Sequence, residues 1–348
     1  ELKFIKKKKT KVSSTLCFLI PFIFFQTIYW LLAFRYNFYH YFQEKYTMSI
    51  VMIFGALIGG MTTEGGGAVA FPIMTLALNI SPIVARDFSF MIQSCGMTAA
   101  SFTILFMGIL VEWHSILFST FGAIFGVIFG LEIIDPLMTP AEKKMTFVSV
   151  FFSFAIALFI LNFEKKRKTF NKIDQFTVSK ALILMINGFA GGIFTGIAGS
   201  GIDIYSFSIL TLFFRISEKV ATPTSVILMA ANSIVGFFWR HFMQNESWEY
   251  FAVCIPIVVI FAPIGSFIAS CLHRLTLASF IYILETTVSA LLIIKLDWPL
   301  IILTISIIIG SLIFYITMSQ CGKKLMIQKI KPLEMKEKMN DITVASVV

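Results

Sequence analysis

The stretches GALIGGMTTEGGGAVAFP (residues 55–72) and GGIFTGIAGSG (residues 191–201) decide the fold. Each lies inside an apolar segment, 48–80 or 181–214, that is too long for one membrane-spanning helix of about 20 residues. Clustered glycines weaken a helix by about 1 kcal/mol each relative to alanine. Each segment is therefore predicted to form two short helices that meet at a glycine-rich break.

The composition places these breaks in a membrane protein. Of the 348 residues, 57% are hydrophobic and only 14% are charged, and the mean hydropathy is +0.87. Soluble domains contain about 25% charged residues, so the composition excludes a soluble enzyme, a secreted disulfide scaffold and a disordered chain. Further apolar runs long enough to span a bilayer cover residues 13–34, 88–111, 114–133, 145–163, 222–240, 251–271, 276–294 and 298–318.

The positive charges indicate how the chain crosses the membrane. The net charge is +9, and the Lys and Arg residues cluster beside apolar runs, which favours a topology signal and contact with anionic lipid over nucleic-acid binding. If each glycine-broken segment enters the membrane and returns, the basic segment 164–180 and both termini are cytoplasmic. If each segment crosses once, more of the basic residues lie outside. The positive-inside rule therefore favours the hairpins.

The chain also repeats itself with a period of about 135 residues. The matched pairs are Gly65 and Gly199, Gly67 and Gly201, Ala85 and Ala221, Ser89 and Ser225, Trp113 and Trp248, and Gly130 and Gly265. Combined with the hairpin topology, the two copies have opposite orientations in the membrane. Inverted repeats with paired, glycine-interrupted segments are typical of secondary transporters.

These observations predict an all-α polytopic membrane protein made of two inverted repeats. Each repeat is a glycine-broken helical hairpin followed by three spanning helices, and one extra helix lies at each end. The predicted segments are a basic cytoplasmic tail (1–12), an extra helix (13–34), repeat 1 (48–163), a basic cytoplasmic linker (164–180), repeat 2 (181–294), a second extra helix (298–318) and a cytoplasmic tail (319–348).

Residues 55–72, with ARDFS at 85–89, resemble the first signature of the TauE/SafE sulfite exporter family, also called the 4-toluene sulfonate uptake permease family. Residues 191–201, with ATPTS at 221–225, resemble its second signature. The resemblance covers residues 48–320 and implies transport of small sulfur-containing anions such as sulfite, sulfonates or sulfoacetate. The chain departs from the family pattern at Ser200, Asp203, Tyr205 and Ser206, which bears on the substrate rather than on the fold.

The two breaks are the first candidate for an anion site. A half-helix that begins at a break points free N–H groups and the positive end of its dipole into the site, and glycine lets an anion approach the backbone. The alternative is that these glycines only allow close helix packing, which is the expected role of Gly122, Gly126 and Gly130. The candidate substrate-binding residues at the breaks are Gly65, Gly66, Gly67, Gly199, Ser200 and Gly201.

Neutral polar side chains near the breaks suit an oxyanion that must bind and then leave. These candidates are Gln93, Ser94, Thr222, Thr224, Ser225 and Asn232. Hydrogen bonding between helices is the alternative role for each Ser or Thr. Ser225 is favoured as a ligand because the repeat matches it with Ser89.

Three acidic residues lie at membrane depth, where ionisable groups usually have a function: Glu64, Asp203 and Glu285. A carboxyl group that takes up a proton beside the anion would couple transport to protons. For Glu64 and Asp203, capping of the following half-helix is an equal alternative. Arg240 ends a span and is expected to extend toward lipid headgroups.

The predicted function is therefore a carrier for small sulfur anions in a multi-pass membrane protein, with the plasma membrane as the expected location and both termini cytoplasmic. An anion channel is the main alternative. An intramembrane hydrolase using Ser200 is a weaker one, because the four histidines lie at span ends and a nucleophilic serine needs a base. The sequence predicts no cofactor, metal or nucleic-acid partner. Membrane lipid is an expected partner, and a homodimer is left open.

Overall fold

The computed structural model describes residues 14–62, 65–163, 169–240, 243–272 and 298–345. These parts form helices, with one isolated β-bridge between Phe170 and Ile216. The helices are α1 (Ser14–Tyr36), α2 (Tyr39–Met61), α3 (Gly65–Pro72), α4 (Pro82–Met107), α5 (Trp113–Phe129), α6 (Pro140–Phe163), α7 (Val178–Ala198), α8 (Ile202–Ser208), α9 (Glu218–Trp239), α10 (Asn245–Cys271) and α12 (Trp298–Ala345). Short π or 3-10 turns follow some of them: η1 (Ile73–Ala77), η2 (Gly130–Ile134), η3 (Asp135–Leu137) and η4 (Ile209–Phe213).

The predicted fold class, an all-helical polytopic membrane protein, is confirmed. Seven helices within the described residues are long and apolar enough to cross a membrane. The predicted span 276–294 lies outside the described residues. The predicted hairpins are present in a modified form, because their first arms, α2 and α7, have 23 and 21 residues rather than being short. Only the second arms are short, and each one, α3 or α8, continues directly into a π turn.

The backbone shows a matching local pattern at the spacing found in the sequence. In each half, the second residue after the π turn has a left-handed conformation, Asn79 (φ 55°) or Arg215 (φ 56°). Two residues later a serine, Ser81 or Ser217, occupies the N-cap position of the next helix with nearly the same dihedral angles. Both pairs are 136 residues apart, the spacing that also relates Ser89 to Ser225.

The two halves are interleaved rather than side by side. Helix α5 of the first half packs along α7, and α10 of the second half packs along α2. Glycines allow these close contacts, as predicted for Gly122, Gly126 and Gly130: a Cβ at any of them would overlap backbone atoms of α7. Gly60 and Gly265 have the same role between α2 and α10. Helices α4 and α9 pack against each other and are the most buried of the apolar helices described.

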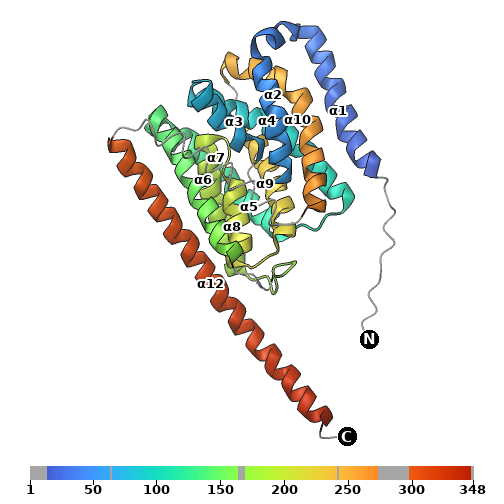
Figure 1. The fold of residues 1–348 in the computed structure, drawn as a ribbon, viewed down its shortest axis with the longest axis vertical. Helices are drawn as coiled ribbons and strands as arrows, with labels where there is room; N and C mark the ends of the chain where they lie inside the picture. The colour runs from blue at the N-terminus through green and yellow to red at the C-terminus, as the bar shows by residue number, and fades with distance from the viewer. Residues whose placement is uncertain (1–13, 63–64, 164–168, 241–242, 273–297, 346–348) are drawn as a thin grey trace.

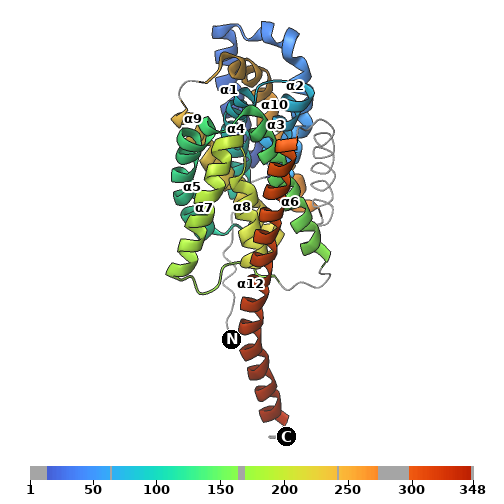
Figure 2. The ribbon, with the colours of Figure 1, turned by 90° about the vertical axis from the view of Figure 1, so that its left-hand side faces the viewer.

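The orientation of the halves can be followed in the ribbon views. In Figures 1 and 2, α2 starts at the top of the bundle and α7 starts at the bottom. The short helix α3 lies nearer the top, and α8 lies nearer the bottom. This arrangement supports the inverted orientation of the repeats, which stays a prediction.

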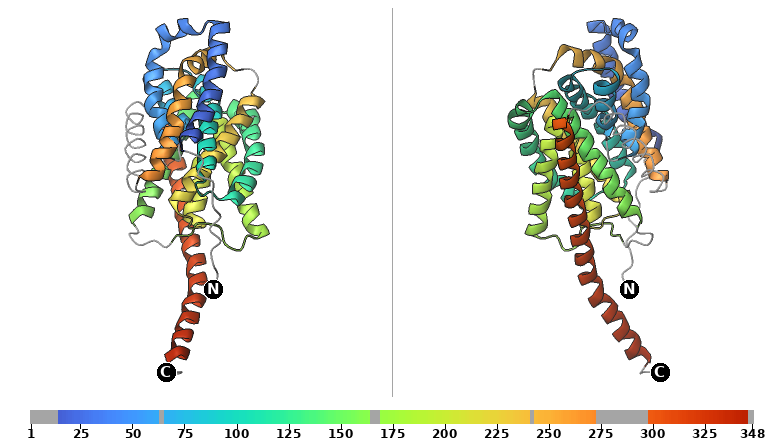
Figure 3. Two further views of the ribbon diagram at one scale, coloured as in Figure 1. Left: turned by 90° about the vertical axis from the view of Figure 1, so that its right-hand side faces the viewer. Right: turned by 60° about the vertical axis from the view of Figure 1, so that its left-hand side comes forward.

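The two extra helices lie at opposite edges of the bundle (Figure 1). Helix α1 packs on α4 and α10, and α12 packs on α6 and η4. The expected helix 298–318 is much longer in the structure: α12 is one helix of 48 residues that extends well below the rest of the protein (Figure 3). The segment 319–345, predicted as a cytoplasmic tail, thus continues this helix.

Candidate functional site

Both glycine breaks lie against one turn of α4. Gly67, after the first break, is so close to Gln93 that a Cβ at this position would overlap the Gln93 Nε2 atom. Gly199, in the second break, is equally constrained, because a Cβ there would lie 2.6 Å from the Cβ of Ser89. Gln93 Nε2 donates a hydrogen bond to the Gly199 carbonyl at 3.2 Å, and Ser233 of α9 donates to Gln93 Oε1 at 3.4 Å. Gln93 thus connects the breaks of both halves.

The second break is closed by its own polar groups. Gly199 ends α7 in a left-handed conformation (φ 78°). The first N–H group of α8, on Ile202, donates to the Thr195 hydroxyl at 3.0 Å, and the Ser200 hydroxyl donates to Asp203 Oδ2 at 3.0 Å. All of these residues are fully buried or nearly so. The N–H of Ile202 is therefore already bonded within the protein, and Asp203 lies in the first turn of α8.

The first break is less crowded on one side. A Cβ at Gly66 would have only ordinary contacts, the nearest at 3.7 Å to the Met52 Cε. Gly65 begins α3, and Thr62 caps the end of α2 with its N–H bonded to the Ile58 carbonyl. Glu64, and likewise Glu285, lie outside the described residues.

The other predicted polar residues differ in how fully they are already bonded. The Thr224 hydroxyl accepts from the Glu112 N–H at 2.9 Å and donates to the Val220 carbonyl, so it ties α9 to the loop before α5. Ser225 and Ser94 each donate to a carbonyl three residues earlier in their own helix. Asn232 differs: it is 1% exposed, and neither amide atom has a hydrogen-bond partner within the described residues.

A cavity of about 470 Å³ lies next to the first break, between the two halves. Its walls are the ends of α2, α4 and α10 and the start of α9. The polar residues that line it are Thr62, Asn171, Ser217, Glu218, Lys219, Thr222, Ser266 and Ser270. Thr222 is the predicted substrate residue found among them. Thr62 lines the cavity immediately before the first break, so the cavity reaches the edge of that break.

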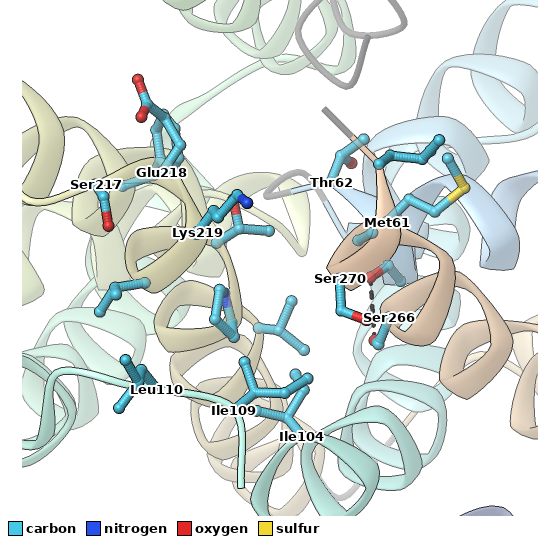
Figure 4. Close-up of a pocket in the computed structure, with 18 of the residues that line it drawn as sticks. Met61, Thr62, Ile104, Ile109, Leu110, Ser217, Glu218, Lys219, Ser266 and Ser270 are labelled. Atoms are coloured by element: carbon cyan, nitrogen blue, oxygen red, sulfur yellow. Dashed lines mark hydrogen bonds between the residues drawn. The ribbon is translucent and has the colours of Figure 1, made fainter. Parts of the chain in front are cut away.

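Lys219 is the cation of this cavity wall (Figure 4). Its exposed side chain extends from the first turn of α9 into the space between α9 and the end of α2. The sequence analysis counted Lys219 only as a topology charge. Its position in the sequence could have indicated a site role, because Lys219 lies two residues after Ser217 at the N-cap position and two residues before the ATPTS motif.

A buried ion cluster lies where the sequence analysis expected no site. Arg86 Nη2 lies 3.0 Å from Asp87 Oδ1, and Arg86 Nη1 lies 2.6 Å from Asp135 Oδ2. Lys143 Nζ contacts Asp135 Oδ1 at 2.6 Å, and Arg240 Nε contacts Asp87 Oδ1 at 2.8 Å. Arg240 was expected to extend toward headgroups. It instead turns inward, because the fully buried Asp87 carboxylate offers a charged partner.

The comparison with protein families was made on this sequence. The model described as "Sulfite exporter TauE/SafE" matches residues 48–292. The chain belongs to the TauE/SafE sulfite exporter family. The comparisons with curated proteins and with solved structures gave no match. Family membership and the apolar helices together make this chain a multi-pass membrane transporter of the sulfite exporter type.

Proposed function

We propose that this protein is a carrier for small sulfur-containing anions of the sulfite, sulfonate or sulfoacetate class. The observation that carries the proposal is the cavity between the halves, which is lined by Lys219, Glu218 and several hydroxyl groups and ends beside a glycine break. Its volume of about 470 Å³ is in the range of small-molecule sites. The carboxylate of Glu218 offsets part of the Lys219 charge, so the wall with its neutral hydroxyl donors attracts an anion without holding it permanently.

The start of α9 adds to this attraction. Ser217 occupies the N-cap position without a side-chain bond to the helix, and the N-terminal residues of α9 form part of the cavity wall. A helix N-terminus stabilises a nearby negative charge by about 0.3–1 kcal/mol when exposed and up to about 2 kcal/mol when partly buried. We infer that Lys219 and this helix end receive the anion before it reaches the breaks.

The innermost part of the proposed path is the polar layer at α4 and α9. It comprises the glycines of both breaks, Ser200, and the polar residues Gln93, Ser94, Thr222, Thr224, Ser225 and Asn232. Asn232 supports this reading most directly, because a buried amide without partners costs free energy unless a ligand bonds it. Asp203, Glu64 and Glu285 remain the proposed proton-coupling groups.

The proposed orientation places the cavity on the cytoplasmic side. Asn171 of the basic linker lines the cavity, and the positive-inside rule assigns this linker to the cytoplasm. The plasma membrane, the cytoplasmic termini, lipid contact and a homodimer are parts of the proposal that stand on the sequence alone.

Reconstitution into liposomes tests the function. Labelled sulfite, sulfoacetate, taurine and sulfate are offered with and without a pH gradient, and empty liposomes serve as the control. A carrier saturates and accelerates uptake when unlabelled substrate is present on the opposite side. Uptake that shows neither saturation nor exchange, together with steady ionic current, would establish the channel instead. Absence of flux for all four compounds would contradict the substrate class.

A further inference from the structure

The ion cluster and the cavity occupy equivalent positions in the two halves. The repeat relates α4 to α9 at a spacing of 136 residues and α5 to α10 at a spacing of 135. At these spacings, four of the five cluster residues match residues of the cavity wall. The pairs, cluster residue first, are Arg86 and Thr222, Asp87 and Pro223, Arg240 and Ile104, and Asp135 and Ser270. The match of the fifth, Lys143, lies outside the described residues.

The same place is open in one half and filled in the other. In the second half, a cavity lies beside the start of α9. Around the start of α4, Arg86 and Asp87 have no exposed surface, and Asp135 and Lys143 are almost as buried. The cluster joins the start of α4 to the end of α9, to η3 and to the start of α6. It therefore connects the elements that would have to separate to make a second cavity.

We propose that this ion cluster is the closed gate of a second vestibule, on the face of the protein opposite the cavity. The inference rests on the proposed carrier function. In a carrier built from two equivalent halves, the two end states exchange the arrangements of the halves. When the second vestibule opens, Arg240 leaves Asp87 and Arg86 leaves Asp135. At the same time Thr222 and Pro223 approach Ile104 and Ser270 and close the present cavity.

Ion pairs are suited to a gate that must open into water. Buried pairs gain little net free energy over the hydrated charges, because desolvation offsets much of their attraction. Water that enters on opening therefore compensates the separated charges. The cluster holds three basic and two acidic side chains, so its formal charge is positive, and the open gate presents Arg86 to an anion as the cavity now presents Lys219.

Cysteine accessibility tests the gate directly. The five native cysteines are replaced, and Ser89→Cys reports on the space between Arg86 and the breaks, one helical turn inside the cluster. Ser270→Cys reports on the exposed cavity wall. Each protein is reconstituted, and an impermeant thiol reagent is added from one side at a time. The gate is weakened with Arg240→Gln, which leaves Asp87 paired with Arg86.

With the native gate, the cysteine at position 89 should react slowly from the cluster face. Arg240→Gln should raise this rate at least 10-fold and lower the rate at position 270. Lys143→Gln, which leaves Asp135 paired with Arg86, should act in the same direction and replaces Arg240→Gln if that variant does not fold. Glu132→Gln is the control: it removes a charge near the cluster that bonds Trp239 rather than a cluster residue, and it should change neither rate.

Two results would overturn the gate. If the cysteine at position 89 reacts at the native rate in folded gate variants, the cluster only stabilises the fold. If Glu132→Gln raises this rate as much as the gate variants do, the increase reflects general loosening of the structure around the cluster. The proposed substrate is judged separately, because the labelling rates require no flux. Rates that respond as expected in a protein that moves none of the four anions would retain the gate and reject the substrate class.

Discussion

In the first half, Ser81 is the N-cap residue of α4 and is followed by Pro82 and Ile83; in the second, Ser217 holds the N-cap position of α9 and is followed by Glu218 and Lys219. The two caps have nearly identical backbone angles. The side chains after them differ in charge, and the charges of the first half appear instead at Arg86 and Asp87, which match the neutral Thr222 and Pro223. Two helix starts with the same backbone geometry thus carry an open polar wall in one half and a closed ionic layer in the other.

The two breaks also differ in packing. The largest loss of stability is expected at Gly199, where the second break has no room for a side chain. Gly199→Ala should destabilise the protein, because alanine disfavours a φ of 78° and its Cβ would lie 2.6 Å from the Ser89 Cβ and 2.8 Å from the Arg86 carbonyl. Overpacking of this kind costs roughly 1–3 kcal/mol. Thermal unfolding in detergent measures the loss. A melting temperature equal to that of the native protein would remove the claimed difference between the breaks.

Gln93→Ala sharpens the comparison, because Gln93 is the side chain that touches both breaks. Its loss leaves the Gly199 carbonyl without this buried donor, and an unsatisfied buried group costs about 1–3 kcal/mol. We expect anion flux in liposomes to fall at least 10-fold. Gln26→Ala is the matched control, since the Gln26 amide donates to the Pro256 carbonyl at 2.7 Å between α1 and α10, away from the breaks. Equal losses in both variants would point to stability rather than to the path.

A smaller effect is expected at the charged wall of the second half. Lys219→Gln should raise the KM for the transported anion about 5-fold and leave the maximal rate nearly unchanged, because an exposed charge contributes about 1 kcal/mol. Lys180→Gln is the control. It removes a lysine whose Nζ bonds the carbonyls of Asp174 and Gln175, outside the cavity wall. A KM that is the same in both variants would show that Lys219 does not meet the anion.

The smallest effect is expected at Gly66, the counterpart of Ser200. Alanine fits there, with the Met52 Cε at 3.7 Å, so Gly66→Ala should keep both the melting temperature and the flux close to native values. The paired measurement with Gly199→Ala uses the same substitution in both breaks. Strong loss of flux in Gly66→Ala with an unchanged melting temperature would place the substrate against this glycine.

The sequence was sufficient for the apolar helices and the two breaks, because apolar runs and glycine clusters act locally. It could not reveal that Gln93 bridges Gly67 and Gly199, since this depends on how α4 crosses both breaks. Nor could it reveal the ion cluster: Arg86, Asp135 and Arg240 are far apart in the chain and meet only through the packing of four elements. The length of α12 was missed because a charged segment after an apolar run is typical of a tail.

That length has a mechanical consequence. At 1.5 Å per residue, the 48 residues of α12 form a rod of about 72 Å, more than twice the roughly 30 Å of hydrocarbon in a bilayer. Its apolar run ends before Lys323 and Lys324, so the 23 residues from Lys323 to Ala345 project about 35 Å farther along the helix. A fluorophore attached at Ala345 would therefore stand clear of the lipid surface and would report the tilt of α12 by energy transfer to labelled headgroups.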